Sequence, residues 1–184
     1  MTEPLLRPAA ATDMPAVTDI YRHAVLHGTA SFEIEPPTEE EMLRRFRAIV
    51  DGGYPYLVAE IGGAVAGYAY VGPYRTRPAY RFTVENSVYI APAAQGKGVG
   101  RALLLALIQA CTVQRYRLMI AVIGDSGHHA SIGLHRQLGF RFCGTLHAVG
   151  YKFSRWLDSV IMELPLGEGG STLPLEEPVR LARR

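Results

Sequence analysis

Gln95-Gly96-Lys97-Gly98-Val99-Gly100 is a glycine-rich stretch between two apolar segments, one over residues 82–90 that is typical of a strand and one over 101–114 that is typical of a helix. Closely spaced glycines let backbone N–H groups converge without obstruction by Cβ atoms. The first turn of the following helix adds free N–H groups and the positive end of its dipole. The stretch therefore predicts an anion-binding turn, and a pyrophosphate is the anion that fits it best.

Two phosphate-binding motifs do not match this turn. A P-loop places Ser or Thr after its lysine, whereas Gly98 follows Lys97. A dinucleotide fingerprint needs its third glycine at Arg101 and an acidic residue about twenty positions further on, where Tyr116 stands. The turn is therefore either a plain connection between strand and helix or the site of another ligand that contains a pyrophosphate.

Outward from this turn, hydrophobic periodicity predicts the order strand, helix, helix, three strands, helix, strand, helix and two strands. This order predicts an α/β fold with a mixed central sheet flanked by helices. Residues 165–184 lack periodicity, so we expect a domain over 1–164 and a C-terminal tail over 165–184. Helices are expected from the Thr12-Asp13 cap to Gly28, from the Thr38-x-x-Glu41 capping box to Gly52, and over 101–114 and 131–138. Strands are expected over 5–7, 56–61, 64–71, 82–90, 118–123, 140–146 and 156–164.

The overall composition limits the class of protein. The 184 residues are 48% hydrophobic, and this fraction excludes wholesale disorder. The formal net charge is only +2, so the sequence lacks the basic excess that is typical of nucleic-acid binders. The longest apolar run, residues 102–108, is far shorter than the roughly 20 residues that cross a bilayer. No secretory signal is visible after Met1. We therefore expect a cytoplasmic protein that binds neither membrane nor nucleic acid.

Two further features bear on this expectation. The arginines Arg44, Arg45 and Arg47 and the Arg183-Arg184 end are typical of a solvated helix face and a tail, and no duplex-binding motif accompanies them. Cys111 and Cys143 both lie in apolar stretches and are expected to be buried free thiols, as in a reducing compartment.

The Gln-x-x-Gly-x-Gly pattern of the turn resembles the acetyl-CoA pyrophosphate loop of the GNAT N-acetyltransferases. Further motifs, in matching order, resemble the phosphinothricin acetyltransferase branch, which includes the methionine sulfoximine and methionine sulfone acetyltransferases. The resemblance covers about residues 4–164. It is carried by Thr-Ala-Ser-Phe-Glu at 29–33, Gly-Tyr-Ala-Tyr at 67–70, residues 75–80, Thr-Val-Glu-Asn-Ser-Val-Tyr-Ile at 83–90, Leu-His-Arg-Gln-Leu-Gly-Phe at 134–140, and residues 149–158.

The resemblance implies a GNAT fold and transfer of acetyl from acetyl-CoA to the α-amine of a small amino-acid analogue, such as phosphinothricin, methionine sulfoximine or methionine sulfone. Other amino acids, a polyamine or a protein N-terminus stay open as acceptors. A non-catalytic module that binds acetyl-CoA is the alternative from another class. The joint presence of Glu85, His135 and Arg75 argues against that module.

Acetyl transfer requires that the amine lose a proton, because an α-amino group has a pKa of roughly 7.7–8.0. Glu85 lies on the strand that leads into the turn, where its carboxylate can reach the thioester end of the co-substrate. The resemblance implies that Glu85 is the general base, acting through water; the alternative is an ordinary solvated carboxylate. His135 stands where many GNAT enzymes carry a tyrosine that acts as general acid. It is either a proton-transfer group or a hydrogen-bonded structural histidine.

The resemblance also implies the residues that bind acetyl-CoA. The strand backbone at residues 88–90 is expected to hydrogen-bond the pantetheine arm, and one N–H polarises the thioester carbonyl, an effect on the order of 3 kcal/mol per donor. His128 stands where the branch commonly has an Asn that contacts the co-substrate, and His also donates. The full set is Val88, Tyr89, Ile90, Gln95, Gly96, Lys97, Gly98, Val99, Gly100, Arg101, His128 and Ser131.

The acceptor site is expected to involve the loop that faces the start of the Glu85 strand. A guanidinium suits the carboxylate or phosphinate of an amino-acid analogue, and Arg75 is a better candidate than Arg77; the alternative for both is a surface arginine. Phe32 and Glu33 resemble the substrate-side wall of the branch, or they anchor a loop. The residues expected at the acceptor are Phe32, Glu33, Arg75, Arg77, Thr83, Asn86 and Ser87.

Three remaining expectations concern cysteine, metal and assembly. Neither cysteine has a His-paired motif, so we expect direct attack without a covalent acyl-enzyme. His23 and His27 are spaced as helical metal ligands, but no third ligand is evident, and we expect no metal. Lys152 and Trp156 are expected to order the C-terminal strands, which in this branch help to form a homodimer.

Overall fold

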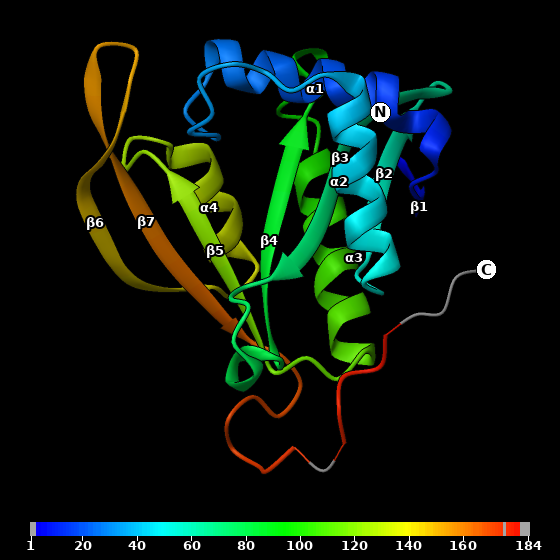
Figure 1. The fold of residues 1–184 in the computed structure, drawn as a ribbon, viewed down its shortest axis with the longest axis vertical. Coiled ribbons are helices and arrows are strands. Elements are labelled where there is room, and N and C mark those ends of the chain that lie inside the picture. The colour runs from blue at the N-terminus through cyan, green and yellow to red at the C-terminus, as the bar shows by residue number, and fades with distance from the viewer. Residues whose placement is uncertain (1–2, 175, 181–184) are drawn as a thin grey trace.

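The computed structural model describes residues 3–174 and 176–180, which contain a seven-stranded sheet in the order β1-β2-β3-β4-β5-β7-β6 (Figure 1). The predicted order of elements and the mixed sheet are confirmed. The strands are β1 (Leu5–Pro8), β2 (Tyr56–Ile61), β3 (Ala64–Pro73), β4 (Thr83–Ile90), β5 (Leu118–Gly124), β6 (Arg141–Lys152) and β7 (Arg155–Pro165). The helices are α1 (Met14–His27), α2 (Glu39–Asp51), α3 (Val99–Val113) and α4 (His129–Gln137), with 3₁₀ turns at Ala11–Asp13, Pro78–Tyr80 and Pro92–Ala94.

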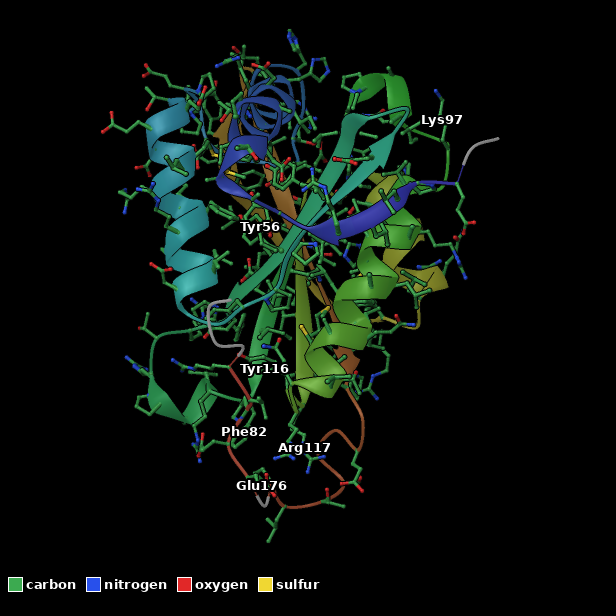
Figure 2. The ribbon with its side chains drawn as sticks, turned by 90° about the vertical axis from the view of Figure 1, so that its right-hand side faces the viewer. Tyr56, Phe82, Lys97, Tyr116, Arg117 and Glu176 are labelled. Carbon is green, nitrogen blue, oxygen red and sulfur yellow. The ribbon has the colours of Figure 1, made fainter. Side chains whose placement is uncertain are left out.

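Helices cover both faces of the sheet, and Figure 2 shows α2 and α3 on opposite sides of it. One apolar cluster joins α1 and α2 to β2 and β3, and Tyr56 and Tyr68 are central to it. The second cluster joins α3 to the other face, where the fully buried Leu103, Leu104 and Leu107 lie. None of the described helices is long and apolar enough to cross a membrane.

The single parallel pairing, between β4 and β5, is short. Its register runs only from Thr83 opposite Leu118 to Asn86 opposite Ala121, although β4 continues to Ile90 and β5 to Gly124. Beyond this pairing the two strands diverge toward their carboxyl ends, as Figure 1 shows. The sheet is therefore split at its centre, and unpaired backbone of both strands faces the gap.

The β6 strand differs most from the sequence expectation. It was expected to end at Leu146 but continues to Lys152, because two irregularities in its pairing with β7 interrupt the alternation that sequence periodicity detects. Cys143 was expected to be buried and is exposed. The reason is that β6 is the edge strand, and even its apolar Phe142 is 60% exposed. Cys111 on α3 is buried, as expected.

The capping box expected at α2 is only half formed. Thr38 Oγ accepts the Glu41 N–H at 3.2 Å, as expected. The Glu41 carboxylate does not return to the cap, because it accepts hydrogen bonds from Arg44 and Arg45 instead.

The segment after β7 returns along the lower end of the sheet (Figures 1 and 2). Leu166 is 1% exposed and belongs to the α3 cluster. Arg117 contacts Glu168 and Thr172, and the Val179 N–H donates to the Gln114 carbonyl at 2.8 Å. The predicted division at residue 164 stays a prediction, and residues 181–184 of the expected tail lie outside the described residues.

Candidate active site

A cavity of about 240 Å³ lies in the gap between the carboxyl ends of β4 and β5. The start of α4 and the segment after α1 complete its walls. It brings together eight of the residues expected at the site from separate parts of the sequence. Its lining residues are Ala30, Ser31, Glu85, Asn86, Ser87, Val88, Tyr89, Ala121, Val122, Ile123, Gly124, His128, Ser131 and His135.

Asn86 holds the point where the two strands separate. Its side chain is buried, and Nδ2 donates to the Ile120 carbonyl of β5 at 3.0 Å, across the last part of the parallel ladder. Its Oδ1 lies 3.0 Å from Nε2 of His135. Both polar atoms of the Asn86 amide therefore already have partners inside the protein.

His135, on α4, contacts the Asn86 side chain. It is 3% exposed, its Nδ1 lies 2.8 Å from the Ser131 carbonyl, and its ring packs edge-on against Phe140. Burial lowers the pKa of His135, and the hydrogen bond to the Ser131 carbonyl opposes this effect. Both ring nitrogens face oxygen acceptors, so a neutral imidazole donates to only one of them, whereas an imidazolium donates to both.

Glu85 is a half-buried carboxylate on the cavity wall. Among the described residues, no side chain or backbone group makes a hydrogen bond or an ion pair to it. Burial raises the pKa of Glu85 above its ordinary value of 4.5, and the charge of Arg75 acts in the opposite direction. A carboxylate that is desolvated but unpartnered is uncommon in a folded protein, and it marks a candidate for proton transfer.

The two candidate arginines are placed differently. Arg75 stacks on Tyr74, with its guanidinium 5.0 Å from the ring centroid. Its positive charge acts to lower the pKa of Glu85. Arg77 is exposed at the start of the Pro78–Tyr80 turn, and its side chain makes no hydrogen bond or ion pair within the described part of the chain. Thr83 begins β4, outside the cavity lining. Arg75, unlike Arg77, therefore interacts electrostatically with Glu85, although neither arginine lines the cavity.

His128 caps the N-terminal end of α4 and lines the cavity together with Ser131. Burial lowers the pKa of His128, and the nearby Asp125 opposes this effect. Its Nδ1 is buried and has no hydrogen-bond partner among the described residues. A neutral His128 therefore has one ring nitrogen available for a hydrogen bond, at the position where the phosphinothricin branch is expected to carry Asn.

The glycine-rich turn has the backbone expected of an anion site. Gly96 and Gly98 have φ of 73° and 81°, a region that L side chains rarely adopt, and Gly98 caps α3. The N–H groups of the first turn of α3 have no intrahelical partner. Lys97 projects away from the body of the protein (Figure 2), and residues 95–98 and Arg101 are exposed. The turn lies next to the gap because Ile90, at the end of β4, precedes it by five residues.

Phe32 and Glu33 anchor the segment after α1. The Glu33 carboxylate accepts hydrogen bonds from Tyr21 Oη at 3.0 Å and from Arg45 at 2.6 Å, so it connects the segment to α1 and α2. The Phe32 ring lies over Gly150 of β6 and Gly124 of β5, where a Cβ would approach the ring to 2.4 Å and 2.9 Å. Both residues therefore anchor the segment whose Ala30 and Ser31 line the cavity, but neither lines the cavity itself.

Sequence reasoning missed several residues at the cavity. Ala30 and Ser31 line it and belong to the 29–33 motif, but they were not expected as site residues; residues 121–124 of β5 also line it and carried no functional signal in the sequence. Among the described residues, no group of three or more His, Cys, Asp or Glu side chains is placed to hold a metal ion. His23 and His27 form only a ring contact, with centroids 4.7 Å apart.

A mixed sheet that is split between β4 and β5, followed by a glycine-rich turn, agrees with the acetyltransferase fold that the sequence resemblance implies, and comparison with known proteins supports it. The model of the acetyltransferase (GNAT) family matches residues 17–140, and the chain belongs to this family of N-acetyltransferases.

Individual relatives are close. A phosphinothricin N-acetyltransferase of Alcaligenes faecalis is 56% identical over 88% of this chain and 82% of its own length. An L-methionine sulfoximine/L-methionine sulfone acetyltransferase of Salmonella typhimurium is 44% identical over 89% and 95%. The crystal structure of a phosphinothricin acetyltransferase from Sinorhizobium meliloti in complex with acetyl-CoA superimposes with a TM-score of 0.93, at 50% identity, over 96% of both chains.

The Asn86–His135 contact predicts a measurable energetic coupling. Asn86→Ala removes the side-chain donor to the Ile120 carbonyl and leaves Nε2 of His135 without its partner, so the single variants should each lose about 1–3 kcal/mol of stability. In a double-mutant cycle with His135→Ala, the coupling energy should be about 0.5–3 kcal/mol, measured by urea unfolding. Losses that simply add would contradict a direct bond between these two side chains.

Proposed function

We propose that the protein transfers acetyl from acetyl-CoA to the α-amine of a small amino-acid analogue of the phosphinothricin, methionine sulfoximine or methionine sulfone type. The names of the relatives support this substrate class. The observation that carries the proposal is Glu85, a half-buried carboxylate with no hydrogen-bond partner among the described residues, on the wall of a small cavity. Because the reaction consumes acetyl-CoA, the proposal places the protein in the cytoplasm, where that metabolite is made.

The chain has the features that acetyl-CoA requires. The open N–H groups of the turn at residues 95–101 suit the pyrophosphate, with Gly96 and Gly98 supplying the conformation. From Ser87 onward, β4 is paired with β3 on one side and unpaired toward β5 on the other. That free edge suits the amides of the pantetheine arm, and His128 and Ser131 lie across the gap. The Sinorhizobium meliloti relative supports this assignment, because its structure contains acetyl-CoA.

In the proposed reaction, Glu85 removes a proton from the acceptor ammonium through water. The amine nitrogen then attacks the thioester carbonyl carbon, the C–S bond breaks, and the nitrogen loses its second proton as the amide forms; this proton balances the one that the departing CoA thiolate takes up. A raised pKa suits Glu85 for this task, because a base works best when its pKa approaches that of the group it deprotonates. No acyl-cysteine is needed: neither Cys111 nor Cys143 lines the cavity, and burial raises the pKa of Cys111 to about 12.

We assign His135 the role of holding Asn86 rather than of moving a proton. Its two ring nitrogens both face protein oxygens, so neither is available to a substrate without breaking a contact. Arg75 is proposed to attract the acidic group of the acceptor, because its guanidinium is exposed and its charge acts on Glu85.

A thiol-release screen tests the acceptor. Phosphinothricin, methionine sulfoximine and methionine sulfone should outpace free amino acids, spermidine and a peptide with a free N-terminus. Arg75→Ala should raise KM for the best acidic acceptor roughly tenfold and leave KM for acetyl-CoA unchanged, because one charged hydrogen bond is lost. Arg81→Ala, which removes a neighbouring arginine paired with Glu177, is the matched control. Binding of acetyl-CoA without thiol release for any amine would leave a non-catalytic module.

Glu85→Gln tests the base and predicts opposite effects on rate and stability. The turnover number should fall by about 10²–10⁴-fold, while Kd for acetyl-CoA stays the same by calorimetry. The raised pKa means that the folded protein disfavours the Glu85 carboxylate, so ionisation above pH 4.5 costs stability. The variant should therefore melt at a higher temperature than the wild type at pH 7, and this gain should disappear as pH falls below 4.5.

Glu41→Gln is the control for this prediction, and it should change the stability at pH 7 in the opposite direction. Its hydrogen bonds to Arg44 and Arg45 lower the pKa of Glu41 to about 2, so its carboxylate contributes stability above pH 4.5 that is lost as pH falls toward 2. The control should melt slightly lower at pH 7 and keep the wild-type rate. An unchanged rate in Glu85→Gln would remove Glu85 from the mechanism.

We propose a homodimer formed through the β6–β7 hairpin. Large apolar side chains are exposed on it, including Phe142 at 60%, Tyr151 at 59% and Trp156 at 65%. Tyr151 and Trp156 are cross-strand neighbours with ring centroids 5.2 Å apart, so the apolar surface is continuous there. Exposed apolar patches of this kind mark interaction surfaces.

Sedimentation equilibrium tests this assembly. The wild type should sediment at twice its chain mass of 20.2 kDa, and Trp156→Glu should sediment at the monomer mass because it places a charge in the apolar face. Val113→Glu, at a position on α3 that is 79% exposed, should stay dimeric. A wild-type monomer at micromolar concentration would contradict the proposal.

A further inference from the structure

Lys152, the last residue of β6, is a buried lysine with an unusual set of partners. It is 5% exposed, and Nζ donates to the backbone carbonyls of Ser31 at 2.8 Å and Gly28 at 3.0 Å. Its ammonium also lies 4.9 Å from the centroid of the Phe153 ring. Nothing in the reaction proposed above uses this residue.

Burial of this ammonium is costly, which points to a role for it. Within the described part of the chain, no carboxylate lies at ion-pair distance from Nζ. Burial lowers the pKa of Lys152, and the more distant Glu33 opposes this effect. A lysine that is buried without an ion pair must be satisfied by hydrogen bonds, and here both come from one short backbone segment.

That segment, residues 28–31, has few other bonds of its own. The Gly28 N–H closes the last turn of α1 onto the Ala24 carbonyl, and no strand pairing follows. Ser31 Oγ is 2.8 Å from Tyr21 Oη and accepts the Glu33 N–H, so side chains rather than a ladder hold it. Ala30 and Ser31 form a wall of the cavity that Glu85 also lines. The position of this wall therefore depends on a few contacts.

The segment packs closely against the end of the sheet, at positions where only glycine fits. A Cβ on Gly124, the last residue of β5, would approach the Thr29 carbonyl oxygen to 2.1 Å. A Cβ on Gly150 of β6 would approach the Phe32 ring to 2.4 Å. These two glycines let the segment lie directly on β5 and β6, and Lys152 fixes it there through its carbonyls.

We propose that Lys152 is a positioning residue for the acceptor amine. By binding the Gly28 and Ser31 carbonyls, it sets how far Ala30 and Ser31 stand from Glu85 across the cavity, and so the size of acceptor that fits beside the base. This inference rests on the proposed function for its substrate but not for its structural part. Acetyl-CoA is placed by the proposed function on the turn and the β4 edge, and the hydrogen bonds and ring contact of Lys152 involve other residues.

Lys152→Met, which keeps the length of the side chain and removes its donors, tests the proposal. KM for the acetylated amine should rise about tenfold or more, because a displaced wall misplaces the acceptor, while KM for acetyl-CoA should stay within about twofold. Lys152→Arg, which keeps a cationic donor, should recover most of the acceptor affinity. Arg141→Met, on the same strand and paired with Glu163 outside the cavity lining, is the matched control and should change neither KM.

Two kinetic outcomes would overturn the proposal. Equal rises in both KM values would show that Lys152 only supports the fold. An unchanged acceptor KM in Lys152→Met would show that the wall does not depend on it.

Hydrogen–deuterium exchange separates this inference from the proposed function. Without any acceptor, the peptide spanning residues 28–33 should exchange at least tenfold faster in Lys152→Met than in the wild type, because its backbone loses two anchoring hydrogen bonds. Unchanged exchange there would overturn the proposal whatever the enzyme acetylates. If the wild type acetylates no amine, the proposed function fails, and exchange alone decides the role of Lys152.

Discussion

The site depends on a parallel pairing between β4 and β5 that stops after Asn86 and Ala121. A sheet that continued pairing would satisfy its backbone groups internally and leave no gap for a ligand. Asn86 holds the two strands together at the last pair by donating to Ile120, and His135 fixes the orientation of its amide. Two buried side chains thus define where the gap begins, and the helix and loop residues around the cavity only close it.

The face of β4 that carries Glu85 becomes aromatic toward the carboxyl end of the strand. Side chains alternate along the strand, so Ser87 and Tyr89 share its face, and on β3 Tyr70 and Tyr68 stand opposite them. Tyr68 stacks on Tyr89 with centroids 5.3 Å apart, and its buried hydroxyl has no partner among the described residues. Such a wall costs stability through unpartnered polar groups. Burial at the cavity raises the pKa of Glu85, a shift that an exposed strand carboxylate would lack.

Sequence periodicity predicted the order of elements because it reports which face of a segment is apolar. The turn was also predictable, since Gly96 and Gly98 have the positive φ that only glycine adopts without strain. Periodicity does not report which element covers a face, so it missed that β6 is an edge strand and that Cys143 is exposed. The contact of Lys152 with Ser31 joins residues 121 apart in the sequence and leaves no local pattern.

The β6–β7 hairpin links the cavity to the proposed dimer face. On one side Lys152 holds the segment after α1, and on the other Arg155 pairs with Asp125, in the loop that leads to His128. The exposed Trp156 directly follows Arg155 and stands opposite Tyr151 in the hairpin. If dimerisation orders this hairpin, it orders both loops, and the acceptor then binds the dimer more tightly than the monomer. Linkage is reciprocal, so the acceptor must strengthen the dimer by the same factor.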